Sequence, residues 1–362
     1  MTNRFLIFIF LANLFIACSS STEDIEESIV ISNTPTTVSK PNIILIIADD
    51  VSKDAIPNYP EGNVKANMPN LQNLMSTGIT FDNTWAYSVC TPTRASIITG
   101  KYGVKTNVIE VGDQISTSEI SLQQYINNAT NNAYATAIFG KWHISNNPND
   151  PATMGIDNYS GILNGGIQDY YNWNYLENGI SINTNEYATS KLTDLAIDWK
   201  NQQTKPFFLW MAYNAPHTPF HLAPTNLHSQ GTLSTDTASI DSNPLPYYLS
   251  ALEALDSEMG RLLNSLSTEE RNNTIVIFIG DNGSPNQVAQ FPYGRRTVKG
   301  SLYQGGINVP MVVSGVGVSR MGARETALIN TTDFYTTIAN IAGVGSKTLH
   351  NSQSFYDLFS DL

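Results

Sequence analysis

Four apolar segments of the chain each run directly into residues that can bind ions or move protons. The segments and the residues that follow them are 42–48 with Asp49 and Asp50, 133–139 with Lys141 and His143, 207–212 with His217, and 274–279 with Asp281 and Asn282. Carboxylate and amide oxygens bind hard metal ions, and lysine and histidine bind anions or transfer protons. Each group alone also fits a surface turn, but their shared position after a strand-like segment favours a site.

The segment 90–100, CTPTRASIITG, has the features of a helix start. Thr91 is predicted to cap the helix, Pro92 suits its first position, and Gly100 ends it. Cys90 would then lie just before a helix N-terminus, where backbone N–H groups favour an anion. The alternative is a buried cysteine beside a short helix.

The elements that must position these residues are strands alternating with helices. Buried parallel strands are predicted at 42–48, 133–139, 207–212, 274–279 and 309–313, which are short apolar runs. Helices are predicted at 68–77, 118–128, 186–201, 247–266 and 332–342. The alternation predicts a doubly wound α/β sheet. In such sheets ligands bind beyond the carboxyl ends of the strands, where the polar residues of this chain occur.

Composition excludes several classes of protein. The 362 residues include 31 Asp and Glu against 19 Lys and Arg, so the net charge of −12 argues against a nucleic-acid binder. Hydrophobic residues make up 41% of the chain, which is enough for a core and argues against disorder. Two cysteines exclude a disulfide scaffold. The length fits one large or two ordinary domains.

The N-terminus has the pattern of an export signal. Residues 5–17 form an apolar run that is too short to span a membrane and fits a signal peptide. The run ends at Cys18 and resembles a bacterial lipobox, although Phe15 stands where leucine is usual. Residues 19–40 are acidic and rich in Ser and Thr, and they indicate a tether. The chain is thus predicted to be exported to the periplasm or cell surface and anchored to the outer membrane by a lipid on Cys18. An ordinary secretory signal and a plain linker are the alternatives.

The pattern Cys-x-Pro-x-Arg at 90–94, followed by Thr99-Gly100, resembles the signature of sulfatases in the alkaline-phosphatase superfamily. The resemblance extends from about residue 41 to residue 358. The other family blocks occur in order at 41–50, 140–143, 215–219, 281–283 and 299–306. The resemblance implies the fold of that superfamily, a mixed and mostly parallel sheet with helices on both faces.

The resemblance also implies a nucleophile and a metal. Family members have the motif cysteine oxidised to formylglycine by a maturase, and Cys90 takes that place. The hydrated aldehyde is the nucleophile in these enzymes. The metal is usually calcium, and the matching positions are Asp49, Asp50, Asp281 and Asn282, together with the modified side chain of Cys90. The four unmodified residues are oxygen donors, as calcium prefers.

The remaining family positions fall on basic residues. Arg94 matches the arginine that supports the nucleophile, and Lys141 and His143 match the pair that contacts it. An extended backbone would place Lys141 and His143 on one side. His217 and Lys299 match the pair that binds sulfate and assists the leaving oxygen. A turn histidine and a surface lysine are the alternatives for His217 and Lys299.

Two positions and the C-terminal region depart from the family pattern. Lys105 and Asn308 stand where many relatives have arginine, which affects contacts to substrate. Relatives also continue into a small C-terminal antiparallel subdomain, whereas this sequence ends at Leu362. The interpretation is a signal peptide at 1–18, a tether at 19–40 and a C-terminally truncated catalytic domain at 41–362.

The expected function is hydrolysis of a sulfated carbohydrate or aryl sulfate, and the expected membrane contact is the lipid anchor alone. Two alternatives remain open. The first is a phosphomonoesterase or phosphodiesterase of the same superfamily, although those enzymes usually have a Ser or Thr nucleophile and two metals. The second is an inactive glycan-binding surface lipoprotein, which would have lost site residues that are all present here.

Overall fold

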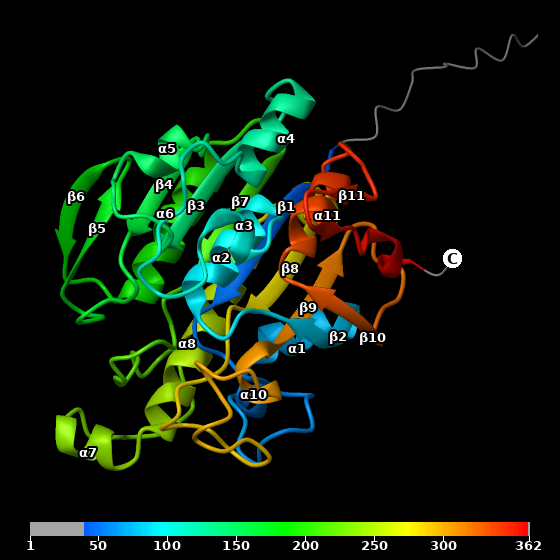
Figure 1. The fold of residues 1–362 in the computed structure, drawn as a ribbon. Helices are drawn as coiled ribbons and strands as arrows, with labels where there is room; N and C mark the ends of the chain where they lie inside the picture. The colour runs from blue at the N-terminus through cyan, green and yellow to red at the C-terminus, as the bar shows by residue number, and fades with distance from the viewer. Residues whose placement is uncertain (1–39, 361–362) are drawn as a thin grey trace, which may run out of the picture. The chain divides into compact units, whose positions relative to one another are not determined.

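The computed structural model describes residues 40–360. The predicted signal peptide with its lipid-anchored cysteine, at 1–18, and all but the last residue of the tether predicted at 19–40 lie outside the described residues. Ten strands form one sheet, in the order β10-β2-β9-β8-β1-β7-β3-β4-β5-β6 (Figure 1). They are β1 (Asn42–Ala48), β2 (Gly78–Trp85), β3 (Ala135–Lys141), β4 (Asn158–Ile162), β5 (Trp173–Glu177), β6 (Ile180–Thr184), β7 (Phe207–Ala212), β8 (Thr274–Gly280), β9 (Asn308–Gly315) and β10 (Ala323–Asn330). β11 (Thr348–Leu349) and β12 (Ser352–Gln353) form a separate antiparallel pair.

Helices cover both faces of this sheet, as predicted. They are α1 (Pro69–Thr77), α2 (Cys90–Thr99), α3 (Gly103–Thr106), α4 (Leu122–Thr130), α5 (Asp150–Thr153), α6 (Ala188–Asn201), α7 (Thr237–Ser242), α8 (Leu245–Asn264), α9 (Thr268–Asn272), α10 (Gln304–Ile307) and α11 (Asp333–Ile341). Short 3₁₀ turns occur at Lys53–Ala55 and Tyr356–Phe359. Within residues 40–360, no helix is both long and apolar enough to cross a membrane.

Strand β1 explains how two cores form on one sheet. Successive side chains of a strand point to opposite faces. Ile44 and Ile46 therefore pack with residues of α1, α6 and α8, and Ile43 and Leu45 pack with residues of α2, α4 and α11. Each of these side chains is fully buried, which contributes roughly 1.5–3 kcal/mol per side chain. Strand β1, which leads into Asp49 and Asp50, is therefore packed on both of its faces.

The central strands β8, β1, β7, β3 and β4 are parallel to one another. The predicted mixed and mostly parallel sheet is therefore confirmed. The prediction that residues 309–313 form a parallel strand is wrong, because β9 runs antiparallel to both β8 and β2. The chain stays near the carboxyl end of β8 through residues 281–307 and then enters β9 without a helical crossover. A parallel strand needs such a crossover.

Several element boundaries also differ from the predictions. The helix predicted at 118–128 is α4, which begins at Leu122 because the Ser121 hydroxyl caps it by accepting from Gln124 N at 3.0 Å. The helix predicted at 247–266 is α8, two residues earlier at both ends. Strand β3 begins at Ala135 and extends to Lys141, so the lysine is the last residue of the strand.

Candidate functional site

The polar residues that follow β8, β1, β7 and β3 meet at one edge of the sheet. These four strands are adjacent and parallel, so their carboxyl ends coincide. Backbone hydrogen bonds join the segments beyond them: Asp49 N donates to Ala215 O at 3.2 Å, and Asp281 N donates to Ala48 O at 3.1 Å. The structure thus brings together all ten residues singled out from the sequence.

The chain turns at Asp50, which allows two adjacent aspartates to face the same site. Strand β1 ends at Ala48, and Asp50 has a φ of 67°, in the left-handed region. Asp50 N donates to Asp281 Oδ1 at 3.0 Å. This turn directs both carboxylates into the site.

Three buried carboxylates face three basic side chains. Asp49, Asp50 and Asp281 are each at most 1% exposed. Their partners are given by four contacts: Lys141 Nζ to Asp49 Oδ2 at 2.6 Å, Lys299 Nζ to Asp50 Oδ2 at 2.6 Å, and Arg94 Nη2 and Nε to Asp281 Oδ2 at 2.7 and 3.1 Å. Burial raises the pKa of the Asp49 carboxyl, but Lys141, His217 and Arg94 outweigh it and hold that pKa below its usual value. The charges balance, so a bound divalent cation would make the site positive.

Two buried oxygen atoms in this cluster lack a hydrogen-bond partner, although Arg94 Nη2 lies 3.8 Å from one of them, Asp49 Oδ1. Asp49 Oδ1 and Asn282 Oδ1 make no hydrogen bond within the described residues. The Asn282 amide is oriented by its nitrogen, which donates to Asp50 Oδ1 at 2.7 Å. Burial and the neighbouring Asp49 raise the pKa of the Asp281 carboxyl. Orphaned oxygens among crowded carboxylates fit a hard cation such as calcium.

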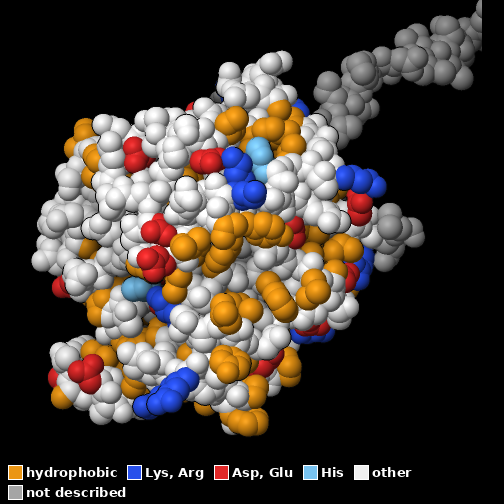
Figure 2. Space-filling model, viewed as in Figure 1, with side chains coloured by type: hydrophobic (Ala, Val, Ile, Leu, Met, Phe, Trp, Pro, Cys, Tyr) orange, Lys and Arg blue, Asp and Glu red, His pale blue; other side chains and the backbone are white. Residues whose placement is uncertain are grey.

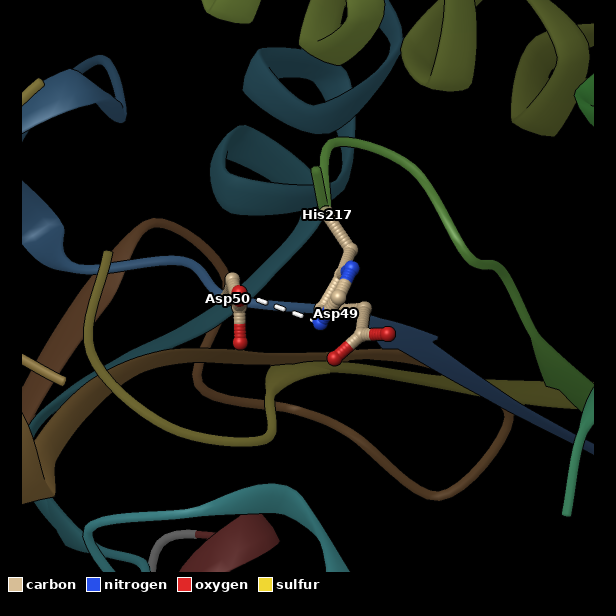
Figure 3. Close-up of side chains that lie close together, drawn as sticks. All are labelled: Asp49, Asp50 and His217. Atoms are coloured by element: carbon tan, nitrogen blue, oxygen red, sulfur yellow. Dashed lines mark ion pairs between the residues drawn. The ribbon is translucent and has the colours of Figure 1, made fainter. Parts of the chain in front are cut away.

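His217 lies beside the two aspartates that follow β1. Figure 3 shows its ring pointing from the segment after β7 toward Asp50, with Nε2 at 3.7 Å from Asp50 Oδ2. One ligand atom from each of Asp49, Asp50 and His217 lies within 4.8 Å of the others, so these three could also hold a metal. His217 Nδ1 lies 2.7 Å from Thr218 O and donates to that carbonyl. Any further proton on the ring would therefore be carried by Nε2.

Cys90 begins helix α2 rather than preceding it. The N-cap is Val89, without a side-chain cap, so the predictions of a Thr91 cap and of Pro92 at the first helical position are wrong. The Thr91 hydroxyl instead lies 3.3 Å from His143 Nδ1. Cys90 Sγ lies 3.2 Å from the same nitrogen. Burial raises the pKa of the Cys90 thiol.

His143 reaches Cys90 through a turn. Strand β3 ends at Lys141, and His143 has a φ of 56°, so the extended backbone predicted across this pair is wrong. His143 N donates to Leu163 O at 3.1 Å, which fixes the turn against the segment after β4. Burial and the charge of Lys141 lower the pKa of His143 to about 2. The His143 ring is therefore uncharged at neutral pH, which leaves one ring nitrogen without a proton.

The segment 163–170, which no motif in the sequence singles out, packs on both histidines. A methyl group at Gly165 would lie 2.7 Å from His143 Nε2, and one at Gly166 would lie 3.0 Å from His217 Cε1. Tyr170 Oη lies 2.8 Å from Asn214 O and 2.9 Å from His217 O. In the sequence, only the glycine pair at 165 and 166 indicates that this segment lies against other side chains, because glycines allow close approach of the backbone.

Comparison with known proteins places this geometry in context. A family model described as Sulfatase matches residues 41–344. The uncharacterized sulfatase YdeN of Escherichia coli (strain K12) is 28% identical over 378 residues, covering 86% of this chain and 64% of that protein. The N-acetylglucosamine-6-O-sulfatase of Bacteroides thetaiotaomicron is 33% identical over 193 residues, covering 52% of this chain and 33% of that protein. The chain thus spans less than two-thirds of the length of either relative.

A solved structure matches over most of the described fold. The crystal structure of Ps i-CgsB in complex with k-i-k-neocarrahexaose is 26% identical, with a TM-score of 0.75. The match covers 86% of this chain and 75% of that chain.

Proposed function

The chain belongs to the sulfatase family, and we propose that it hydrolyses a sulfate ester of a carbohydrate to an alcohol and inorganic sulfate. The observation that carries this proposal is the position of Cys90. Its side chain lies within hydrogen-bond distance of a neutral histidine, beside a cluster of three carboxylates and three cations. Relatives that act on sulfated sugars support the carbohydrate class.

The nucleophile of this proposal is a formylglycine made from Cys90 by a maturase. The hydrated aldehyde would supply one hydroxyl to attack sulfur as the bond from sulfur to the alcohol oxygen breaks. Loss of the proton of its second hydroxyl would then re-form the aldehyde as sulfate leaves. Arg94 supports this position by fixing two elements at once, since it donates to Asp281 Oδ2 and through Nη1 to Lys141 O at 2.7 Å. Lys141 and Lys299 would hold the negative charge of the sulfate.

Calcium is the metal that the donor set fits, and Asp49, Asp50, Asp281, Asn282 and the modified side chain at position 90 would hold it. A bound calcium ion would supply positive charge to neutralise the carboxylates and to polarise a sulfate oxygen. The two orphaned oxygens support this assignment. Asp281 would serve both the ion and Arg94.

Calcium is expected to raise the melting temperature of the protein, and chelation is expected to lower kcat at least about 100-fold. At a calcium concentration about 100 times Kd, the stabilisation would be about 2.7 kcal/mol. Asp281→Ala should remove the calcium-dependent rise in Tm, whereas Asp241→Ala, on the exposed surface of α7, should retain it. Thermal melts with calcium and with chelator measure this. An undiminished rate in metal-free enzyme would contradict the assignment.

The two histidines would have separate roles. His217 is anchored through Nδ1, so it would donate a proton from Nε2 to the leaving alcohol oxygen. His143 would accept a proton from the side chain at position 90 in the stage that frees sulfate.

Tyr170 is expected to position His217, because its hydroxyl is bonded to the backbone of the 214–217 segment at both ends. Tyr170→Phe should lower kcat about 10-fold, as loss of an orienting partner commonly does. Tyr171→Phe is the matched control, since the neighbouring hydroxyl donates to Leu222 O instead. Steady-state kinetics on an aryl sulfate tests this. Equal rates for both variants would mean that Tyr170 does not position the site.

A screen of sulfated monosaccharides and oligosaccharides, after co-expression with a maturase, tests the function. Release of free sulfate from at least one sugar is the expected result. Faster hydrolysis of a phosphate ester than of any sulfate ester would favour the phosphatase alternative, for which Asp49, Asp50 and His217 offer a metal site. No release of either anion would favour a glycan-binding protein.

The export and anchoring of the protein depend on residues outside the described structure. We propose that Cys18 is lipidated and holds the protein at the outer membrane. Cys18→Ser is expected to move the protein from the membrane fraction to the soluble fraction of its host. Fractionation followed by immunoblotting measures this, and an unchanged membrane fraction would contradict the anchor.

A further inference from the structure

A cavity of about 460 Å³ lies against the segment that packs on both histidines. Gly166 lines this cavity and also lies close to His217, since a methyl group at Gly166 would be 3.0 Å from His217 Cε1. The cavity therefore begins one residue away from the proposed proton donor. Its volume is in the range of small-molecule sites, about 300–1,000 Å³.

The lining of the cavity is polar but uncharged. No Asp, Glu, Lys, Arg or His is among the described residues that line it. The polar side chains are Asn146, Asn164, Gln168, Asn172, Asn174 and Ser181. Figure 2 shows that the surface over β4, β5 and β6, at the left of the view, carries few charged side chains. Among the described residues, the lining of this cavity thus has neither acidic nor basic side chains, although the net charge of the chain is −12.

Several of these amides are free to bind a ligand. Within residues 40–360, the side chains of Asn146, Asn164 and Gln168 make no hydrogen bond to the protein. Asn172 and Asn174 use only their oxygen atoms, which accept from Asn183 Nδ2 at 3.3 and 3.0 Å. Their NH₂ groups remain available. An amide offers both donors and acceptors, which matches the hydroxyl groups of a sugar.

The cavity also has an apolar part. Trp173 and Tyr175 line it, and their rings lie 5.5 Å apart at a tilt of 42°. The Trp173 indole is fixed because Nε1 donates to Glu186 O at 3.0 Å. Convergent polar groups with a few aromatic residues form the usual lining of a small-ligand site.

We propose that this cavity is a subsite for an uncharged sugar residue, linked to the sulfated sugar that reacts at Cys90. The inference rests on the proposed function, because it requires that the sugar alcohol released by hydrolysis lies beside His217. A neutral hexose or N-acetylhexosamine would bind by hydrogen bonds to the amides. A hexuronate or a second sulfated sugar would find no cation there and would bind less well.

The test compares three substrates of the matured enzyme. They are a monosulfated monosaccharide, the same sugar linked to a neutral hexose, and the same sugar linked to a hexuronate, with the linkage position varied. The expected kcat/KM for the neutral disaccharide is about 10-fold above that for the monosaccharide, and the hexuronate gives no such gain. The double variant with Asn164→Ala and Gln168→Ala should lower the ratio of the disaccharide and monosaccharide values about 10-fold. Asn185→Ala, an exposed asparagine outside the cavity, should leave the ratio unchanged.

The possible results distinguish failure of the subsite proposal from failure of the proposed function. Equal kcat/KM values for all three substrates, or an unchanged ratio in the double variant, would overturn the subsite and leave the sulfatase proposal standing. A preference for the hexuronate would overturn the uncharged class. No sulfate release from any of the three, or from the wider screen, would overturn the proposed function itself.

Discussion

Cys90→Ala is expected to reduce turnover at least about 10⁴-fold, judged from the loss of a covalent nucleophile in other hydrolases. The Cys90 side chain is 2% exposed and contacts His143, so the substitution removes the proposed nucleophile together with this contact. Initial rates on an aryl sulfate measure the effect. Melting temperatures of the variant and the parent check that the fold is retained.

Mass spectrometry of the peptide that contains residue 90 completes this test. Conversion of the thiol to an aldehyde replaces sulfur and two hydrogen atoms by one oxygen, so the peptide becomes lighter. Arg94 and Pro92 complete the motif that a maturase is expected to read. A fully active enzyme whose Cys90 is an unmodified thiol would contradict the mechanism.

The sequence predicted that seven of the ten site residues would meet at one edge of the sheet, because these seven follow short apolar segments. Strands β1 and β7 have the predicted bounds, and both are continuous runs of buried apolar residues. These two strands pair in parallel, so their carboxyl ends lie on one edge of the sheet. The same apolar pattern at 309–313 wrongly predicted a parallel strand, so the pattern does not fix strand direction by itself. The turn at Asp50, with its positive φ, brings both aspartates to this edge, because adjacent side chains of a straight strand would point to opposite faces.

Local geometry was harder to predict, because tertiary contacts override short-range rules. Thr91 is a good capping residue, yet its hydroxyl contacts His143 instead of a backbone N–H of α2. His143 adopts a left-handed conformation that the sequence does not favour, and its backbone is held by Leu163 from the segment after β4. Neither contact could be foreseen from residues close in sequence.

The role of segment 163–170 in the site was not predicted. The segment shapes the site mainly through its backbone and through glycines, which have no side chain. Gly165 and Gly166 act by leaving room for the two histidines, and Tyr170 acts on backbone carbonyls. The strands β5 and β6 beside it mix polar and apolar residues and lack a continuous apolar run. Such elements give a weak pattern in a single sequence.

His217→Ala is expected to slow release of the alcohol about 10²–10⁴-fold, the usual contribution of a positioned general acid. The loss should be largest for esters with poor leaving groups, since these need a proton most. His217 Nδ1 is bonded to Thr218 O, so Nε2 alone is available to give that proton. Rates for a series of aryl sulfates with different leaving-group pKa values measure the effect. The slope of log rate against that pKa should become steeper in the variant.

His143→Ala is expected to give a different defect, because His143 contacts position 90 rather than the metal-side carboxylates. The variant should release about one equivalent of alcohol per enzyme and then stop, since the stage that frees sulfate would lack its base. Rapid mixing with an activated aryl sulfate separates the two variants. A normal burst in His217→Ala together with no burst in His143→Ala would mean that the two roles are reversed. Burial and the charge of Lys141 keep the His143 ring uncharged, so one ring nitrogen is without a proton and can hydrogen-bond to the side chain at position 90.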